Sequence, residues 1–179
     1  MINETDQIND ISQIKDYLEN QFEYIYKWLS FAEAKNAALV AFNVAMLKVA
    51  NDIKDIPQEL KIFILIFLII SLLIALESFF PNLSSKMKDY ETDTIENKNL
   101  IFFQDIAQVK NEETLLNLIK EKYFPRLDDR YIKEAYLLDL TSEILINSRI
   151  TLNKYKSFKN ALWFDVGAVI FIMLAYLFS

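Results

Sequence analysis

The residues of this sequence that could do chemistry are charged groups beside or inside apolar segments, because histidine and cysteine are both absent. Without them the chain has no imidazole base, thiol nucleophile, disulfide or His/Cys metal site. Carboxylates remain, but no spaced acidic motif for Mg²⁺ or Ca²⁺ occurs. We therefore expect no catalytic residue, no metal and no cofactor, and we expect that the protein is not an enzyme.

Four polar residues lie at the edges of apolar stretches or within them: Lys35, Asn43, Glu77 and Asp165. Ionisable groups at membrane depth are costly, and they usually pair with one another or face a cavity. One interpretation is a gate, in which Lys35, Glu77 and Asp165 hold helices closed until a cytoplasmic signal arrives. The other is an ordinary anchor network at the membrane interface. Asn43 would either donate a hydrogen bond between helices or line a pore.

A second set of residues could contact an anion: Arg126, Arg130, Arg149, Lys154, Lys156 and Lys159. Attraction to lipid phosphate accounts for the three lysines, which lie just before the last apolar segment. Arg149 is the better candidate for a phosphate contact, because a guanidinium can bind phosphate in bidentate fashion. Four aromatic residues could stack on a base or pack in a core: Phe102, Phe103, Tyr123 and Tyr131.

The elements that position these residues are predicted to be helices, since one Gly and three Pro leave little material for β-turns. Residues 62–76 are apolar apart from Ser71, and residues 161–179 form a second apolar segment. The twenty residues from 61 to 80 would span about 30 Å as a helix, enough to cross a hydrocarbon core. The Ala-rich residues 36–50 are either a third span or a buried helix of a soluble bundle.

Four further helix signals complete the pattern. Apolar residues three or four apart predict an amphipathic helix over residues 6–31. Pro57 suits a first helical turn and Pro81 ends the same helix. Asn111 is a predicted N-cap, followed by acidic residues, for a helix that ends at Pro125. No breaker interrupts a long helix predicted over residues 129–178.

The distribution of basic residues predicts the orientation in a membrane. Residues 1–35 and 82–159 hold sixteen of the 19 lysines and arginines, and residues 48–61 hold the other three. The positive-inside rule therefore places both large polar regions in the cytoplasm. The first ten residues lack the basic and apolar regions of a signal peptide, so we expect them to stay there. The net charge of −6 argues against nucleic acid as a partner.

Together these patterns predict an all-α integral membrane protein with about three transmembrane helices continuous with a cytoplasmic helical bundle. The expected parts are a cytoplasmic amphipathic helix (1–31), two spans with a short external loop (32–80), a cytoplasmic helical sensing region (81–159) and a C-terminal span (160–179).

Three stretches resemble a known family. Residues 31–37 (FAEAKNA) with Asn43 resemble the A-D-x-K-A…N opening of the first membrane helix in bacterial Pycsar effector proteins. Residues 99–107 (NLIFFQDIA) resemble their N-x-L-F-F-G-x-I-A segment, and NSRI at 147–150 with Lys154-Tyr155 is similar to their I-x-x-K-[FY] stretch. The likeness covers roughly residues 28–178. Glu33 replaces the usual Asp and keeps its charge, whereas Gln104 replaces a Gly and puts a tight backbone turn in doubt.

The resemblance implies an anti-phage effector. In that family a partner nucleotide cyclase makes cyclic CMP or cyclic UMP on infection, the membrane effector senses it, and membrane integrity fails so that the infected cell dies. On this implication we expect a multi-pass protein of the bacterial inner membrane that forms a homo-oligomer in the lipid bilayer. The expected nucleotide-binding residues are Arg149, Lys154, Arg130 and Phe103. The expected gate consists of Lys35, Asn43, Glu77 and Asp165.

Two other readings of the sequence remain. The first is a non-gated helical scaffold that recruits a partner protein to the membrane. The second is a membrane-embedded enzyme that uses the buried carboxylates. Binding of a cyclic mononucleotide separates the effector from the scaffold. Substitution of Glu77 and Asp165 separates a gate, whose opening threshold would change, from an enzyme, which would lose turnover.

Overall fold

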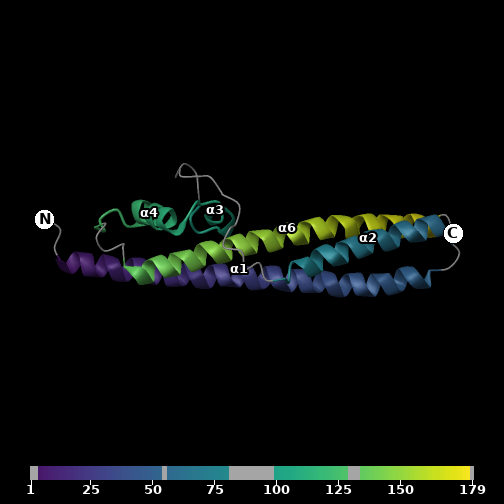
Figure 1. Ribbon diagram of the computed structural model, residues 1–179, viewed down its shortest axis with the longest axis horizontal. Helices are drawn as coiled ribbons and strands as arrows, with labels where there is room; N and C mark the ends of the chain where they lie inside the picture. The colour runs from purple at the N-terminus through teal and green to yellow at the C-terminus, as the bar shows by residue number, and fades with distance from the viewer. Residues whose placement is uncertain (1–3, 54–55, 81–98, 129–133, 178–179) are drawn as a thin grey trace. The chain divides into compact units, whose positions relative to one another are not determined.

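The structure, a computed structural model, describes residues 4–53, 56–80, 99–128 and 134–177, and side chains from Asn9 onward (Figure 1). In these ranges the chain forms helices and no strand: α1 (Glu4–Asp52), α2 (Gln58–Glu77), α3 (Phe103–Ile106), α4 (Glu112–Tyr123) and α6 (Ala135–Leu177). The all-α prediction is confirmed. The helices form two compact units. Unit 1 comprises Met1–Leu29 and Leu83–Leu152, and unit 2 comprises Ser30–Asn82 and Asn153–Ser179.

Unit 1 contains the first part of α1, the short helices α3 and α4, and the first part of α6 (Figure 1). Its core is aliphatic, with buried side chains from each of these helices: Ile14, Leu18 and Ile25 of α1, Ile106 of α3, Leu115, Leu116 and Ile119 of α4, and Leu137 and Ile144 of α6. The α1 residues lie four and seven positions apart, so they share one face of the predicted amphipathic helix. Burial of this stripe holds α3 and α4 against the two long helices.

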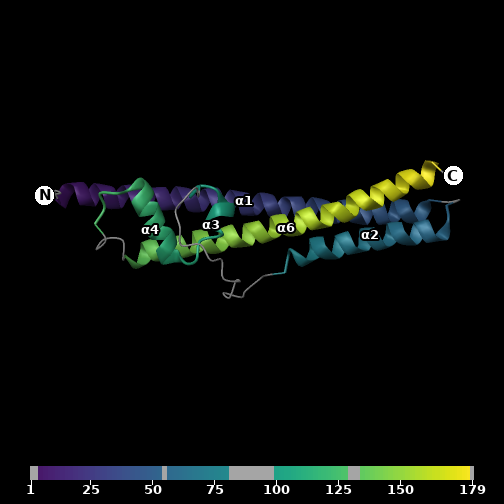
Figure 2. The same ribbon diagram turned by 90° about the horizontal axis from the view of Figure 1, so that it is seen from above.

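Unit 2 is built from the rest of α1, all of α2 and the rest of α6, which run side by side in both views (Figures 1 and 2). One apolar cluster contains Ala50, Ile64, Leu68, Ala168 and Ile172. A second contains Leu39, Ala75 and Ala161. Alanine at these contacts allows close approach of the helix backbones, as is typical of helices packed in a membrane.

A lysine side chain near the start of α2 reaches the C-terminal end of α1. Lys61 Nζ donates to the backbone carbonyls of Asn51 at 2.7 Å and Ile53 at 3.4 Å. These carbonyls lie at or just beyond the C-terminal end of α1, where the last helical acceptors have no partner within the helix. A lysine in the first turn of α2 therefore caps the end of α1.

Several predicted helix ends can be compared with the structure. The Asn111 cap is confirmed, because Thr114 N donates to Asn111 Oδ1 at 2.8 Å. Pro57 occupies the N-cap of α2. α2 was predicted to reach Phe80 but ends at Glu77, because Phe79 N and Phe80 N bond carbonyls three residues back and tighten the chain into a turn.

The two long helices also differ from their predicted bounds. α6 begins at Ala135 rather than near residue 129, and residues 129–133 lie outside the described ranges. α1 is continuous for 49 residues, with no break where the sequence changes from amphipathic to Ala-rich near Ala32. Alanine has the highest helix propensity of all residues, so that segment extends the helix. The predicted extension and loop after Pro81 fall on residues 81–98, also outside the described ranges.

Candidate functional site

Two helices in the described ranges are long and apolar enough to cross a membrane, α2 and α6. Their apolar windows have mean hydropathies of 2.7 and 1.8, yet only 22% and 28% of those windows are buried by the rest of the protein. Leu73 of α2 and Met173 of α6, for example, are 60% and 63% exposed. A core helix of a soluble protein is mostly buried, so this exposed apolar surface suits lipid.

The third span, expected over residues 36–50, belongs to α1. α1 is not one of the two helices that are long and apolar enough to cross a membrane. Its Ala-rich part nevertheless packs against both of them, because Leu39 and Ala50 lie in the two apolar clusters of unit 2. A membrane crossing by this segment stays a prediction.

Three polar side chains meet between the two apolar clusters of unit 2, one from each helix. Asn43 Nδ2 of α1 donates to Ser71 Oγ of α2 at 3.0 Å and to Asp165 Oδ2 of α6 at 3.3 Å. The same nitrogen donates to Leu39 O at 3.0 Å within α1. Asn43 and Ser71 are 0% exposed and Asp165 is 3% exposed. We call these three residues the polar layer.

The polar layer ties the three helices of unit 2 together, but its hydrogen bonding is incomplete. Asn43 Oδ1 and Asp165 Oδ1 are buried with no hydrogen-bond partner in the described part of the chain. A buried polar atom without a partner lowers stability, so a hydrogen-bond donor placed beside either oxygen would stabilise the polar layer.

The sequence predicted two members of the polar layer and missed the third. Asn43 and Asp165, both expected gate residues, are brought into contact. Ser71 was not proposed, although it is the one polar side chain within residues 62–76. A lone hydroxyl in an apolar segment can be recognised in the sequence as a candidate for a hydrogen bond to a neighbouring helix, because such groups commonly make one within membranes.

The other two expected gate residues lie outside this layer. The Lys35 ammonium lies over the rings of Phe31, Tyr155 and Phe158, at 4.7, 5.2 and 5.3 Å from their centroids. An aromatic face attracts a cation, so these rings stabilise Lys35 where the helices meet. Glu77 is exposed at the last position of α2. Neither is in hydrogen-bond contact with Asp165.

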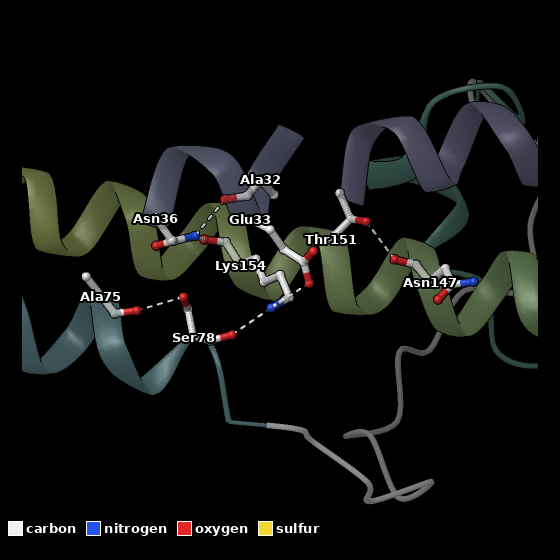
Figure 3. Close-up of polar contacts among 8 residues, drawn as sticks. All are labelled: Ala32, Glu33, Asn36, Ala75, Ser78, Asn147, Thr151 and Lys154. Carbon is white, nitrogen blue, oxygen red and sulfur yellow. Dashed lines mark hydrogen bonds and ion pairs between the residues drawn. The ribbon is translucent and has the colours of Figure 1, made fainter. Parts of the chain in front are cut away.

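Lys154, expected to bind nucleotide, is held by groups of all three helices of unit 2 (Figure 3). Its Nζ donates to Ser78 O at 2.7 Å and lies 3.3 Å from Glu33 Oε1. Its backbone carbonyl accepts from Asn36 Nδ2 at 3.1 Å. The lysine therefore joins α6 to both of the other helices.

Arg149, the other principal candidate, makes a clamp within unit 1. Its Nη2 donates to Val109 O at 2.6 Å and to Lys110 O at 2.9 Å, and its Nε lies 3.3 Å from Ala107 O. The guanidinium of α6 thus fixes the segment that joins α3 to α4. A backbone acceptor leaves no signature in sequence, so pattern reasoning could not find this clamp.

The remaining nucleotide-binding candidates differ in position. Phe103 is 5% exposed and packs on Trp28 with ring centroids 5.5 Å apart. It also contacts Phe102 at 4.8 Å. Arg130 and Tyr131 lie outside the described residues. Nearby, Gln21 Nε2 of α1 donates to Ile101 O at 2.9 Å, which anchors the chain leading into α3.

The chemistry available to these groups is binding and rearrangement. Within the described ranges, no group of three or more acidic, histidine or cysteine side chains could hold a metal ion. The polar layer has one carboxylate, one amide and one hydroxyl. The Arg149 guanidinium donates to backbone carbonyls, which are weaker acceptors than a charged phosphate.

Comparison with known proteins identifies the family. No curated protein and no solved structure matches the chain. The family described as Pycsar effector protein domain matches residues 17–179. That range takes in α2, α6 and the polar layer, and it contains all three stretches that suggested the resemblance. The chain belongs to the Pycsar effector family and is an effector of antiviral defence.

Proposed function

We propose that this protein is the membrane effector of a cyclic-nucleotide anti-phage system in the bacterial inner membrane. It senses cyclic CMP or cyclic UMP made by a partner nucleotide cyclase, and it then disrupts membrane integrity to cause abortive infection. The observation that carries this proposal is the family match over residues 17–179, which takes in two apolar helices whose surface is mostly left unburied.

Unit 1 is the proposed sensing region, because it holds the Arg149 guanidinium, a group able to bind a nucleotide phosphate. Arg149 donates to the carbonyls of Val109 and Lys110, which are neutral acceptors. A nucleotide phosphate is a stronger acceptor and can bind the guanidinium in bidentate fashion. Binding would release residues 107–111 from α6. The bound nucleotide would thereby change the packing of α3 and α4.

Unit 2 is the proposed membrane part, with α1, α2 and α6 as three spans. The polar layer gives one chain three small polar side chains, Asn43, Ser71 and Asp165. Three such groups are too few to line an aqueous channel. Membrane injury therefore requires several chains, whose polar layers would face one another after the helices of each chain rearrange.

A dye-release assay on liposomes that contain the purified protein tests this function. We expect release with cyclic CMP or cyclic UMP, and none with cyclic AMP or cyclic GMP. The Arg149→Gln variant should lose the response. Lys27→Gln, which removes an equal charge from an exposed position of α1 in the same unit, should keep it. Circular dichroism checks that both variants remain helical.

The same assay has outcomes that would overturn the proposal. Intact liposomes with all four nucleotides would exclude direct sensing. If the protein in addition co-purified with a stable partner, the scaffold function would replace the effector function. Equal responses from Arg149→Gln and the wild-type protein would remove Arg149 from the sensing site.

A further inference from the structure

The side chain of Lys154 links the C-terminal end of α2 to the other two helices of unit 2 (Figure 3). Only 13% of this side chain is exposed, which is unusual for a lysine. Its ammonium donates to Ser78 O at 2.7 Å, lies 3.3 Å from Glu33 Oε1 and lies 5.6 Å from the centre of the Phe79 ring.

The contact with Ser78 places a positive charge at the C-terminal end of α2, where the helix has none of its own. Ser78 is the C-cap of α2, and the last turn of this helix contains no basic residue. The final carbonyls of a helix have no partner within it, and they carry the negative end of the helix dipole. A cation placed there is stabilising, and here α6 provides it. Ser78 Oγ meanwhile donates to Ala75 O at 2.7 Å, so the hydroxyl is engaged elsewhere.

The junction of α1 with α6 has its own support, independent of the ammonium. Asn36 is 0% exposed, and its Nδ2 donates to the backbone carbonyl of Lys154 at 3.1 Å. Any side chain at position 154 would keep this bond. Glu33 is half exposed, so its ion pair with Lys154 is partly screened by water. Loss of the ammonium would therefore weaken the attachment of the Ser78 end of α2 and leave α1 and α6 together.

We propose that Lys154 is a latch that holds the Ser78 end of α2 against α1 and α6 in the resting protein. Release of the latch lets this end of α2 move away and separates Ser71 from Asn43 and Asp165. This inference rests on the proposed function for its consequence, which is membrane leakage, but the latch itself is a structural statement. It assigns Lys154 to restraint of a helix and removes it from the nucleotide-binding set.

A distance measurement tests the latch without reference to leakage. The natural chain has no cysteine, so spin labels can be attached at Ala34→Cys on α1 and Phe80→Cys just beyond α2, both exposed positions. Pulsed electron resonance in lipid then measures their separation. Lys154→Met should lengthen and broaden the distribution. Lys154→Arg, which keeps a cationic donor, should resemble the wild-type protein.

Lys159→Met is the matched control, because it removes the same charge from an exposed residue five positions further along α6. It should leave the separation unchanged. An unchanged distribution in Lys154→Met, or an equal change in Lys159→Met, would overturn the latch. Circular dichroism identifies a variant that has lost its helices. In that case Glu33→Gln replaces Lys154→Met. This variant removes only the partly screened ion pair with Lys154, so it should lengthen the spin-label distance less than Lys154→Met would.

Dye release from liposomes without nucleotide measures the membrane leakage that release of the latch would cause. Removal of a hydrogen bond from a charged donor shifts the resting equilibrium about tenfold or more, so Lys154→Met should leak about tenfold faster than the wild-type protein. The double variant Glu33→Lys with Lys154→Glu restores an ion pair but places a carboxylate near Ser78 O, so it should leak as well. A silent double variant would mean that the ion pair, not the carbonyl contact, is the restraint, which contradicts the latch as stated.

The two readouts separate the latch from the proposed function. A changed distance with leaky liposomes supports both. A changed distance with liposomes that stay sealed, with or without nucleotide, supports the latch and contradicts membrane injury by this protein.

Discussion

Truncation of Asn43 is the perturbation whose size follows most directly from the structure. Asn43→Ala removes two hydrogen bonds between helices, to Ser71 at 3.0 Å and to Asp165 at 3.3 Å. Side-chain hydrogen bonds between membrane helices average about 0.6 kcal/mol and reach about 1.7 kcal/mol. Two of them predict a loss of about 1–3 kcal/mol in the free energy of unfolding. Both acceptors are buried, so water cannot replace the lost donor.

The assay is reversible unfolding in lipid bicelles, with a double-mutant cycle on Asn43→Ala and Ser71→Ala. The cycle isolates the interaction between the two residues, and we expect a coupling free energy of about 0.6 to 1.7 kcal/mol. Val44→Ala is the control. Val44 adjoins Asn43 on α1 but is 58% exposed, so this substitution should change the free energy of unfolding little. A coupling free energy indistinguishable from zero would refute the polar layer as a link between helices.

Three further predictions concern single side chains. A Cβ added at Gly167 would lie 2.6 Å from Phe67 Cε1, so Gly167→Ala should lower the free energy of unfolding by about 1–3 kcal/mol, and Phe67→Leu in the same chain should restore part of it, as unfolding in bicelles would measure. Burial, and then the neighbouring Tyr123, raise the pKa of the Tyr17 hydroxyl, so the folded state holds its proton above pH 10, where the unfolded chain releases it. Stability should fall as pH rises above about 10, and Tyr17→Phe should reduce that fall in a pH series of thermal unfolding. Asn111→Ala removes the hydrogen bond from Thr114 N and should lower the free energy of unfolding, measured by chemical denaturation, by about 0.5–2 kcal/mol. Asn111→Asp keeps an acceptor at the cap and should retain most of the wild-type stability.

The features predictable from sequence are those that depend on local chemistry or on periodicity. Asn111 and the acidic residues after it form a recognisable helix start, and the structure has that cap. The absence of a breaker predicted one long helix over residues 129–178, and α6 runs from Ala135 to Leu177. Such signals need only neighbours within a turn or two along the chain.

Contacts with backbone carbonyls of distant segments could not be predicted in the same way. Arg149 bonds carbonyls of residues about forty positions earlier, and Lys154 bonds Ser78 O across 76 positions. Every residue has a carbonyl, so nothing in the sequence marks these acceptors. The charge of each side chain suggested a ligand, whereas the protein itself supplies acceptors for both.

The partners of the charged residues near the apolar segments could not be predicted from the sequence either. The positions of Lys35, Glu77 and Asp165 at the edges of apolar stretches or within them predict that the three charges pair with one another. The structure instead surrounds Lys35 with aromatic rings and brings Asp165 to an amide and a hydroxyl. The rotation of each helix about its axis decides such pairing, and that rotation is set by packing of all three helices at once.

The most direct test of this account asks whether lipid surrounds α2 and α6. Single-cysteine variants Leu73→Cys, Met173→Cys and Tyr136→Cys, made in the cysteine-free chain and inserted into bacterial membrane vesicles, report on exposed positions of α2, of the end of α6 and of unit 1. We predict that a water-soluble maleimide modifies the Tyr136→Cys variant rapidly and leaves the other two unmodified until detergent is added. Equally rapid modification of all three before detergent would show that water, not lipid, covers α2 and α6, and would contradict the account.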